Sequence, residues 1–458
     1  MTHDVPQSAE VVICGAGIAG VSTAYFLTEM GVKDIALVDK QAPLMLTTDK
    51  SVESYRNWWA DEVMARFMDH SIDLLERFAD ESGNSFNMNR RGYAWVTTRD
   101  DKAAQYRDDA HAFDERGFGP IRVYDGTTPD VGPYVPPALE GFEDAPPGAD
   151  LLLDRDAIRE AFPYLGDDVK AVLNPRRCGW LSAQQLGMYW LDEARARGVR
   201  VLRGEVVGVE QDAQGVSAVQ VGEERIETRR LVNAAGPFLG HVGAMLGVDL
   251  PIHNELHQKV VFQDLQGVIP RNAPLVILDE EPFLEWSEEE QAFWEEEPDY
   301  RWMLDRLPTG CHFRPEGTGE SPWLLLAWGV QIEPTEPTWG EPAYSPEYPE
   351  VVLRGACKLA PGLKQYVGRM PNPVMHDGGF YTKTRENRPL IGPLGVDGGF
   401  VVGALSGFGV MASSAAGELA ATWVTGGDLP DYAASLVLQR YDDPAYAASI
   451  EGMEAGEI

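Results

Sequence analysis

The spacing of apolar residues changes twice within a short stretch near the start of the chain. Residues 10–40, EVVICGAGIAGVSTAYFLTEMGVKDIALVDK, contain a β-branched apolar run, a glycine-rich turn, an apolar stretch with helical spacing and a second apolar run that ends in an acid. Short apolar runs bounded by turns are typical of buried strands, whereas apolar residues three and four apart are typical of helices. The pattern therefore predicts a strand-helix-strand unit.

The glycines of this unit have the spacing of a dinucleotide-binding fingerprint. Gly15 would make the tight turn, Gly17 would let a pyrophosphate approach the backbone, and Gly20 would allow the helix to pack closely on the strand. Asp39 follows at the end of the second strand, where an acid accepts hydrogen bonds from ribose hydroxyls. An acid there disfavours a 2′-phosphate and hence NADP, but it does not separate NAD from FAD.

A second segment, VVGALSGFGVMASSAAG at residues 401–417, carries no charged side chain. A membrane-spanning helix needs about twenty strongly apolar residues, and this stretch has too much Gly and Ser for that. Small residues instead allow the backbone to approach a neighbour closely. The segment is thus predicted to be a buried core helix or a cradle for a bound group.

Charge and cysteine content narrow the class of protein. The chain of 458 residues has 72 acidic and 38 basic residues, a formal net charge of -34. Such a surface disfavours nucleic-acid partners and is commonly an adaptation for solubility or salt tolerance. Four cysteines lie far apart, without a C-x-x-C pair, and the N-terminus lacks a basic stretch before its apolar run. These features favour a reducing, cytoplasmic location without structural zinc or disulfides.

Two further stretches carry a family resemblance. Residues 197–238 alternate like paired strands and end in NAAGPF, and residues 380–417 contain YTKT followed by GALSGFG. Together with the glycine fingerprint they resemble the D-amino-acid oxidase superfamily of flavoproteins, and within it the sarcosine oxidase-like enzymes (glycine/sarcosine oxidase type). The resemblance implies FAD as the cofactor.

The resemblance also implies which residues hold FAD. The fingerprint supplies Gly15, Gly17, Gly20 and Asp39, and the NAAGPF strand end supplies Ala235 and Gly236. Val206 resembles a position whose backbone contacts adenine in relatives, although a plain buried strand valine fits equally well. Helix N-termini attract negative charge, and the turn expected at the flavin N1–C2=O edge consists of Gly407, Phe408, Gly409, Val410 and Met411.

The resulting fold class is α/β and α+β, with a discontinuous Rossmann-like FAD-binding domain and an antiparallel-sheet substrate domain. The expected FAD-binding segments are 1–89, 155–250 and 374–440, and the expected substrate-domain segments are 90–154 and 251–373, followed by a tail at 441–458. Residues 126–150 are rich in Pro and Gly and predict a loop. The acidic, aromatic run 279–304 predicts one or two helices, either a lid or a solvated surface helix.

The chain departs from sarcosine oxidases at three positions. Gly379 stands where a cysteine tethers the flavin, Met411 where a lysine binds the substrate carboxylate, and Leu325 where a lysine assists oxygen. FAD is therefore expected to be non-covalent. A soft thioether in place of a cation favours a roomier, less polar substrate site, so sarcosine itself is expected to be a poor substrate.

Several residues are candidates for compensating roles. Arg56 either is a bidentate partner for a substrate carboxylate or forms a salt bridge to the flavin phosphate or to the acidic surface. Lys259 is either a desolvated base or oxygen site, or an outward-facing strand lysine. Tyr381 resembles a tyrosine near the substrate in relatives. The remaining candidates have core packing or backbone contacts as alternatives: Arg385, Arg388, Trp58, Trp59, Trp323 and Trp328.

The predicted reaction is oxidation of the C–N bond of a secondary or N-methylated amine or amino acid to an imine, with hydride transfer to flavin N5 and reoxidation by oxygen or another acceptor. His253 and His257 are four apart but lie in an extended stretch, so no metal is expected. Two alternatives remain open. One is a hydroxy-acid dehydrogenase that passes electrons to a quinone or an electron-transfer protein, and the other is a non-enzymatic, flavin-loaded assembly factor.

Overall fold

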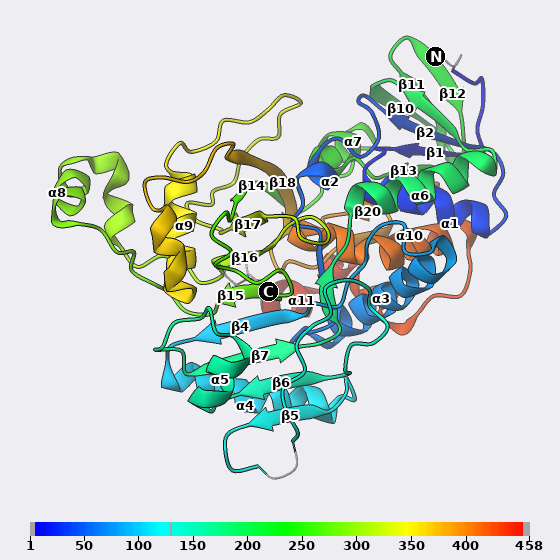
Figure 1. Cartoon of the computed structure of the whole chain (residues 1–458). Coiled ribbons are helices and arrows are strands. Elements are labelled where there is room, and N and C mark those ends of the chain that lie inside the picture. The colour runs from blue at the N-terminus through cyan, green and yellow to red at the C-terminus, as the bar shows by residue number, and fades with distance from the viewer. Residues whose placement is uncertain (1–4, 129–130, 452–458) are drawn as a thin grey trace.

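The computed structural model describes residues 5–128 and 131–451, and two large sheets organise them (Figure 1). One is a six-stranded sheet in the order β19-β20-β13-β1-β2-β9, in which all neighbours are parallel except β19 and β20. Its strands are β1 (Val11–Cys14), β2 (Ile35–Asp39), β9 (Arg200–Arg203), β13 (Leu231–Asn233), β19 (Leu390–Pro393) and β20 (Gly399–Gly403). The predicted strand-helix-strand unit is β1, α1 (Ile18–Glu29) and β2.

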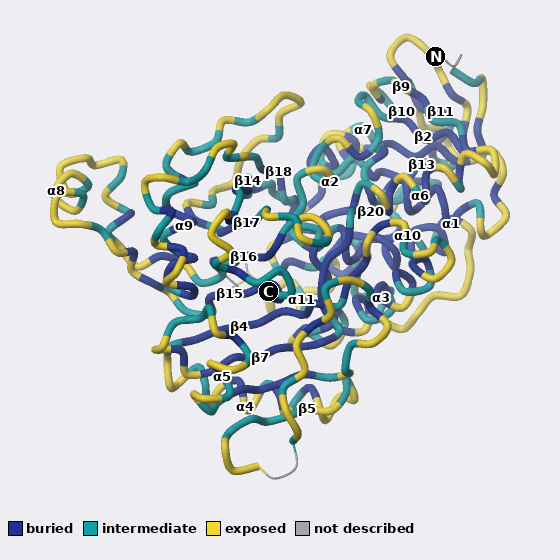
Figure 2. The backbone as a smooth tube through the Cα atoms, viewed as in Figure 1, coloured by how far each residue is buried: buried dark blue, intermediate teal, exposed yellow. Residues whose placement is uncertain are grey.

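Helices cover this sheet and are packed closely on one another. They are α1, α3 (Glu62–Ser82), α6 (Ala183–Ala196) and α10 (Gly409–Thr425), with the short α7 (Leu239–Met245) after β13. A small antiparallel sheet of β10 (Val206–Asp212), β11 (Gly215–Val221) and β12 (Glu224–Glu227) adjoins it. The inner strands β1, β2 and β13 are almost wholly buried (Figure 2), as expected for parallel strands covered on both faces.

The second sheet has nine strands in the order β18-β14-β17-β16-β15-β4-β7-β6-β5. Most neighbours are antiparallel, as predicted, but β15 pairs with β4 and β5 with β6 in parallel. The strands are β4 (Tyr93–Thr97), β5 (Ile121–Tyr124), β6 (Ala149–Leu152), β7 (Ala171–Pro175), β14 (Ile252–Gln263), β15 (Leu275–Leu278), β16 (His312–Pro315), β17 (Trp323–Ala327) and β18 (Met375–Thr384). The predicted fold class is confirmed.

The nine-stranded sheet has two different faces because successive side chains of a strand point to opposite sides. Val260, Phe262 and Leu326 belong to a core cluster with α9 (Tyr348–Leu359), whereas Val261, Leu325 and Ala327 contact Val52 of the segment that leads to β3. The second face therefore looks toward the six-stranded sheet. Helices α4 (Asp100–Glu115) and α5 (Arg155–Ala161) lie beside β5 to β7 (Figure 1).

Two observations bear on the predicted segment boundaries. Strands β7 and β18 fall in ranges 155–250 and 374–440, which were assigned to the FAD-binding domain, yet both pair within the nine-stranded sheet.

The acidic run 279–304 forms α8 (Glu288–Glu296) and a 3₁₀ segment, Pro298–Leu304, and α8 projects from the body of the molecule (Figures 1 and 2). The domain boundaries and the lid remain predictions.

The remaining elements are short. They are α2 (Thr47–Lys50), β3 (Ser54–Arg56), β8 (Cys178–Trp180), α11 (Pro444–Ile450) and five further 3₁₀ segments, Gly236–Phe238, Pro361–Tyr366, Ser406–Phe408, Asp431–Ser435 and Leu438–Asp442. Strands β3 and β8 pair with each other. No helix within the described ranges is both long and apolar enough to cross a membrane.

Candidate active site

A cavity of about 320 Å³ opens at the carboxyl ends of the parallel strands β1, β2, β13 and β20. In open α/β sheets this edge is the usual ligand-binding crevice. The cavity is lined by the glycine turn after β1, most of residues 38–48 at and after the end of β2, residues 204–206, residues 234–238 after β13, and residues 402–407, 409 and 410 at and after the end of β20. Strand β18 contributes Phe380, Tyr381 and Thr382 from the other sheet.

The three fingerprint glycines meet different physical requirements. Gly15 has φ of +109°, and a Cβ there would lie 2.2 Å from the carbonyl oxygen of Ala234. A Cβ on Gly20 would lie 1.9 Å from the carbonyl oxygen of Gly15. At Gly17 a Cβ would meet only Thr48 Oγ1, at 3.6 Å. The protein itself thus requires glycine at 15 and 20, whereas at 17 it leaves room for a side chain, and glycine keeps this part of the cavity open for a ligand.

Asp39 ends β2 beside the glycine turn. Its carboxylate accepts hydrogen bonds from the backbone N–H groups of Ala16 and Gln41, both at 2.7 Å. Burial raises the pKa of Asp39, and these two bonds counteract that effect. Each oxygen retains a second lone pair toward the cavity that Asp39 lines, which fits an acceptor for ribose hydroxyls.

Two helix N-termini border the same cavity. The N-caps of α1 and α10, Gly17 and Phe408, make no side-chain capping bond, and neither helix has an acidic residue in its first turn. Such ends favour a negatively charged or polar ligand. In the turn before α10, Ala404 and Ser406 have φ of +51° and +47°, conformations that cost energy outside glycine and often occur at ligand sites.

The predicted cofactor residues divide into two groups. Most line the cavity: Gly15, Gly17, Asp39, Val206, Ala235, Gly236, Gly407, Gly409 and Val410. Gly20, Phe408 and Met411 do not appear in the lining. Phe408 contacts Trp59 edge to face, and Met411 is buried in the core cluster that includes α3, with its carbonyl accepting a bond from Ser71 Oγ.

Tyr381 joins the cavity to the face of the nine-stranded sheet. A Cβ on Gly407 would lie 2.5 Å from Tyr381 Cε2, so the absence of a side chain at 407 lets the ring pack against this turn. On its other side the Tyr381 ring is stacked on the imidazole of His257, with centroids 3.9 Å apart. Burial raises the pKa of Tyr381 to about 12, so the phenol stays protonated.

His257 belongs to a buried polar cluster. Glu255 accepts hydrogen bonds from Nε2 of His257 at 3.0 Å, Nε2 of His253 at 3.1 Å and Nζ of Lys383 at 2.9 Å. Burial alone would raise the pKa of Glu255, but the bonds from His257 and Lys383 outweigh it and lower the pKa to about 2. Burial lowers the pKa of His257. An ionised Glu255 only accepts, so Nε2 of neutral His257 carries the proton and Nδ1 is a free base.

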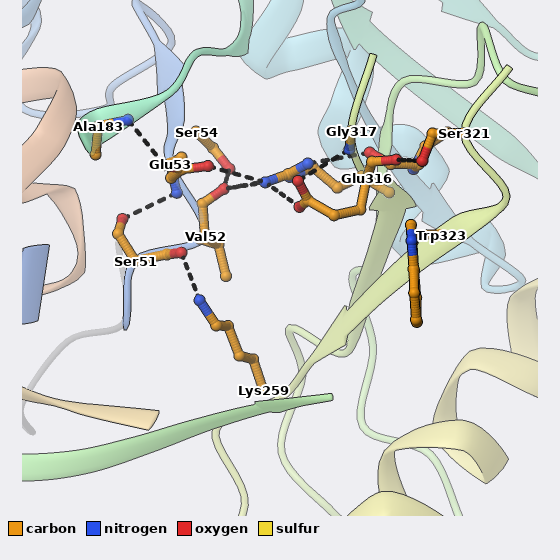
Figure 3. A network of polar contacts seen from close by, with 12 residues as sticks. Ser51, Val52, Glu53, Ser54, Ala183, Lys259, Glu316, Gly317, Ser321 and Trp323 are labelled. Atoms are coloured by element: carbon orange, nitrogen blue, oxygen red, sulfur yellow. Dashed lines mark hydrogen bonds and ion pairs between the residues drawn. The ribbon is translucent and has the colours of Figure 1, made fainter. Parts of the chain in front are cut away.

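Lys259 lies two residues further along the same face of β14. Its Nζ donates to the carbonyl of Ser51 at 3.0 Å (Figure 3). The same Nζ lies 3.7 Å from Asp377. Burial lowers the pKa of Lys259, consistent with the predicted desolvated lysine. The fully buried Arg314 donates to the next carbonyl, that of Val52, through Nε and Nη2. Two cations therefore hold the segment that leads to Arg56.

Arg56 lies among aromatic rings. Its guanidinium carbon is 4.4 Å from the ring centroid of Trp59, 5.5 Å from that of Trp95 and 6.0 Å from that of Tyr93. Tyr93 and Trp95 are neighbours of Ile277 on the face of the sheet that carries Lys259. A guanidinium held by three rings keeps a fixed direction, as a carboxylate partner requires.

The other candidate arginines and tryptophans make contacts within the protein. Arg388 pairs with Asp61, and Arg385 donates to the carbonyl of Glu451. Trp58 is stacked on Phe113, and Trp328 is buried with its Nε1 donating to Pro308. Trp323 and Leu325 lie in the small apolar cluster around Val52.

Metal and thiol chemistry find little support in the described residues. Cys14, Cys178, Cys311 and Cys357 are free and buried, and no group of three or more potential ligands is arranged for a metal ion within 5–128 and 131–451. At Gly379 a Cβ would approach Lys50 Cβ to 2.9 Å. A cysteine at that position would therefore require Lys50 to move.

Comparison with known proteins assigns the class. The family model described as DAO, FAD dependent oxidoreductase, matches residues 10–423. The chain therefore belongs to the family of FAD-dependent oxidoreductases, which confirms the resemblance drawn from the motifs and FAD as the cofactor. The cavity fits this group, because it combines the fingerprint turn, the acid at the end of β2 and two helix N-termini whose N-cap residues make no side-chain capping bond.

Individual relatives are distant. Mitochondrial dimethylglycine dehydrogenase from Rattus norvegicus is 22% identical over 428 residues, which cover 92% of this chain and 43% of that protein. The chain thus spans less than half the length of that relative. L-proline dehydrogenase from P. horikoshii has a TM-score of 0.71 at 20% identity, covering 97% of this chain and 99% of the other. Glycine oxidase from Geobacillus kaustophilus has a TM-score of 0.71 at 16% identity, covering 94% and 99%.

Some site residues escaped the sequence reasoning. Thr48 Oγ1 accepts the N–H of Ile18 at the start of α1, and His241 and Trp339 line the cavity. Trp339 lies in an irregular Pro-rich stretch whose pattern predicts no position in space.

Proposed function

We propose that the protein oxidises the C–N bond of a secondary or N-methylated amine or amino acid to an imine, which water then hydrolyses. FAD supplies the hydride acceptor for this chemistry. The protein must place the substrate beside the cofactor cavity, keep its nitrogen unprotonated and exclude water. The observation that carries the proposal is the neutral His257, fixed by Glu255 and stacked on the cavity residue Tyr381.

An amine reacts as a hydride donor only when its nitrogen lone pair is free. Since Glu255 holds the proton on Nε2 of His257, the Nδ1 atom is the base that would accept a proton from an incoming ammonium group. Burial of the substrate would act in the same direction, because it disfavours the charged form of the amine. The names of the relatives support this choice of substrate class, since they refer to dimethylglycine, L-proline and glycine.

Arg56 is the proposed partner for a substrate carboxylate. The aromatic rings of Trp59, Trp95 and Tyr93 hold its guanidinium, and a carboxylate would add bidentate bonds that fix the substrate. Met411, Arg56 and His257 all lie outside the lining of the cofactor cavity, so the roomier substrate site expected from Met411 stays a prediction. A guanidinium that binds a carboxylate favours an amino acid over a simple amine.

The test is anaerobic mixing of the holoenzyme with N-methyl amino acids, cyclic imino acids, aralkylamines and hydroxy acids, with loss of oxidised-flavin absorbance as the readout. Bleaching by amino acids with a secondary amine is expected. Bleaching by hydroxy acids alone would establish the dehydrogenase alternative, and no bleaching by any compound would favour the assembly factor. Peroxide release or dye-dependent turnover then identifies the electron acceptor.

The roles of two residues can be separated kinetically. Arg56→Lys should raise KM for amino acids with a smaller effect on kcat, because it removes bidentate binding and keeps the charge. His257→Gln should move the pH profile of flavin reduction to higher pH, because the amine then loses its proton to solvent alone. An unchanged KM in Arg56→Lys would contradict the role of Arg56. An unchanged pH profile in His257→Gln would contradict the role of His257.

A further inference from the structure

Trp339 lies in a loop that leaves the nine-stranded sheet and reaches the other sheet. The loop connects β17 to α9, and both of its ends are held on β14 and β18. Thr335 N–H donates to the carbonyl of Asn254 at 2.7 Å, and on the return Tyr344 Oη donates to the carbonyl of Gly378 at 3.3 Å. We call residues 335–344 the strap.

The tip of the strap is held by residues that follow two strands of the six-stranded sheet. The Trp339 indole is stacked on the Phe238 ring with centroids 3.9 Å apart and planes 5° apart, and Lys40 Nζ lies 4.7 Å from the indole centroid. The carbonyl of Trp339 accepts a bond from Gln41 Nε2 at 3.0 Å. Phe238 follows β13, and Lys40 and Gln41 follow β2. The strap thus bridges the ends of two strands that bind the cofactor.

Trp339 is itself part of the cavity lining, together with Gly204, Glu205 and Val206. The acid of the fingerprint, Asp39, marks the adenosine end of a dinucleotide site, and Lys40 directly follows it. Tyr381 and Gly407 also line the cavity, and Gly407 belongs to the turn that the family resemblance places at the flavin. With 36% of its surface exposed, Trp339 forms an outer wall between the adenosine end and solvent.

We propose that Trp339 is an FAD-binding residue that closes the adenosine end of the cavity, and that the strap must lift for FAD to enter or leave. The strap comes from the other sheet, so FAD retention depends on contact between the two parts of the molecule. The Trp339 indole is held by Phe238 and by Lys40, and Lys40 Nζ is itself paired with Glu205 at 3.0 Å. A ring fixed in this way gives the adenosine end a rigid aromatic wall.

The test is the rate of FAD release. Holoenzyme is diluted, and the fluorescence that flavin regains on release is followed with time. Trp339→Ala should release FAD roughly tenfold faster, because stacking and cation–π contacts are lost together, and Trp339→Phe should retain most of the wild-type rate. The absorption spectrum of bound flavin should remain unchanged, because the indole lies at the adenosine end.

Trp58→Ala is a matched control. Like Trp339, Trp58 is stacked on a phenylalanine of another element: it stacks on Phe113 of α4, with centroids 3.5 Å apart and planes 5° apart. Trp58 does not line the cavity. This variant should release FAD at the wild-type rate. Equal acceleration in Trp58→Ala and Trp339→Ala, or a wild-type rate in Trp339→Ala, would overturn the proposal. A shifted flavin spectrum in either Trp339 variant would overturn the adenosine assignment.

Discussion

The Gly17→Val variant should lose FAD binding and keep its fold. An ideal Cβ at Gly17 contacts only Thr48 Oγ1, at 3.6 Å, which is an ordinary van der Waals distance. Gly17 has φ of -71° and ψ of -178°, an extended conformation that valine adopts readily. The variant should therefore fold, with its isopropyl group in the cavity where the pyrophosphate of FAD belongs.

The size of the change in stability follows from the coupling between FAD binding and folding. A ligand present at a hundredfold excess over its Kd stabilises the folded protein by about 2.7 kcal/mol. Wild-type protein should gain this stabilisation from FAD, whereas Gly17→Val should gain almost none, because the side chain and the pyrophosphate cannot occupy one volume. The assay compares thermal unfolding with and without added FAD, and a titration followed by flavin fluorescence gives the Kd directly.

Other glycines supply the controls. Gly240 lies in α7 outside the cavity lining, and a Cβ there would lie 3.9 Å from Ile252 Cδ1, so Gly240→Ala should bind FAD normally. Gly20→Ala should fail to fold, because its Cβ would lie 1.9 Å from the carbonyl oxygen of Gly15. Wild-type FAD affinity in Gly17→Val would refute the cofactor assignment, and unfolding as severe as in Gly20→Ala would refute the steric reasoning.

Three further predictions concern charge and attachment. Lys259→Met should slow reoxidation of the enzyme by oxygen, since a nearby cation stabilises developing superoxide, and should leave anaerobic reduction nearly intact; stopped-flow measurements in which neither rate changes would limit Lys259 to holding Ser51. The hydrogen bond from His70 to Glu418 raises the pKa of His70, so its contribution to stability is fully present below about pH 6.5 and is lost as pH rises through the raised value. Denaturant unfolding should accordingly show a larger cost of His70→Gln at about pH 5.5 than at about pH 8.5, and an equal cost at both would contradict the ion pair. Acid precipitation should release all the flavin to the supernatant, and a flavinylated peptide in the pellet would disprove non-covalent binding.

Local spacing predicted the cofactor turn because each glycine acts on atoms near it in the chain. Gly15 and Gly20 meet each other within a single turn, and Asp39 lies at the end of the adjacent strand. The same logic gives less detail in the turn before α10. Five consecutive residues were expected at the flavin, but successive residues of a helix point about 100° apart. Gly409 and Val410 therefore line the cavity, while Met411 turns into the core.

Long-range contacts could not be predicted in this way. The strap has no helical or strand period, and only the folded chain brings Trp339 to Phe238 and Lys40. Strands β7 and β18 are likewise assigned to a sheet by their partners and not by their position in the sequence. The pairing of Glu255 with Lys383 depends on the register of β14 against β18, which sets Lys383 opposite His253 and so diagonally beside Glu255.

The absence of charge in residues 401–417 has two physical causes that act on different residues. Around Gly407 and Gly409 the backbone borders the cofactor cavity, where a side chain would take up ligand space or displace Tyr381. Further along α10, a Cβ on Gly417 would lie 2.0 Å from Ser22 Oγ, and Ser22 donates to the carbonyl of Ser413. Here small residues let α10 approach α1 at the centre of the molecule. One uncharged stretch therefore fixes the cofactor edge at its start and the helix packing beneath it at its end, so a displacement of α10 against α1 would also displace the turn that faces FAD.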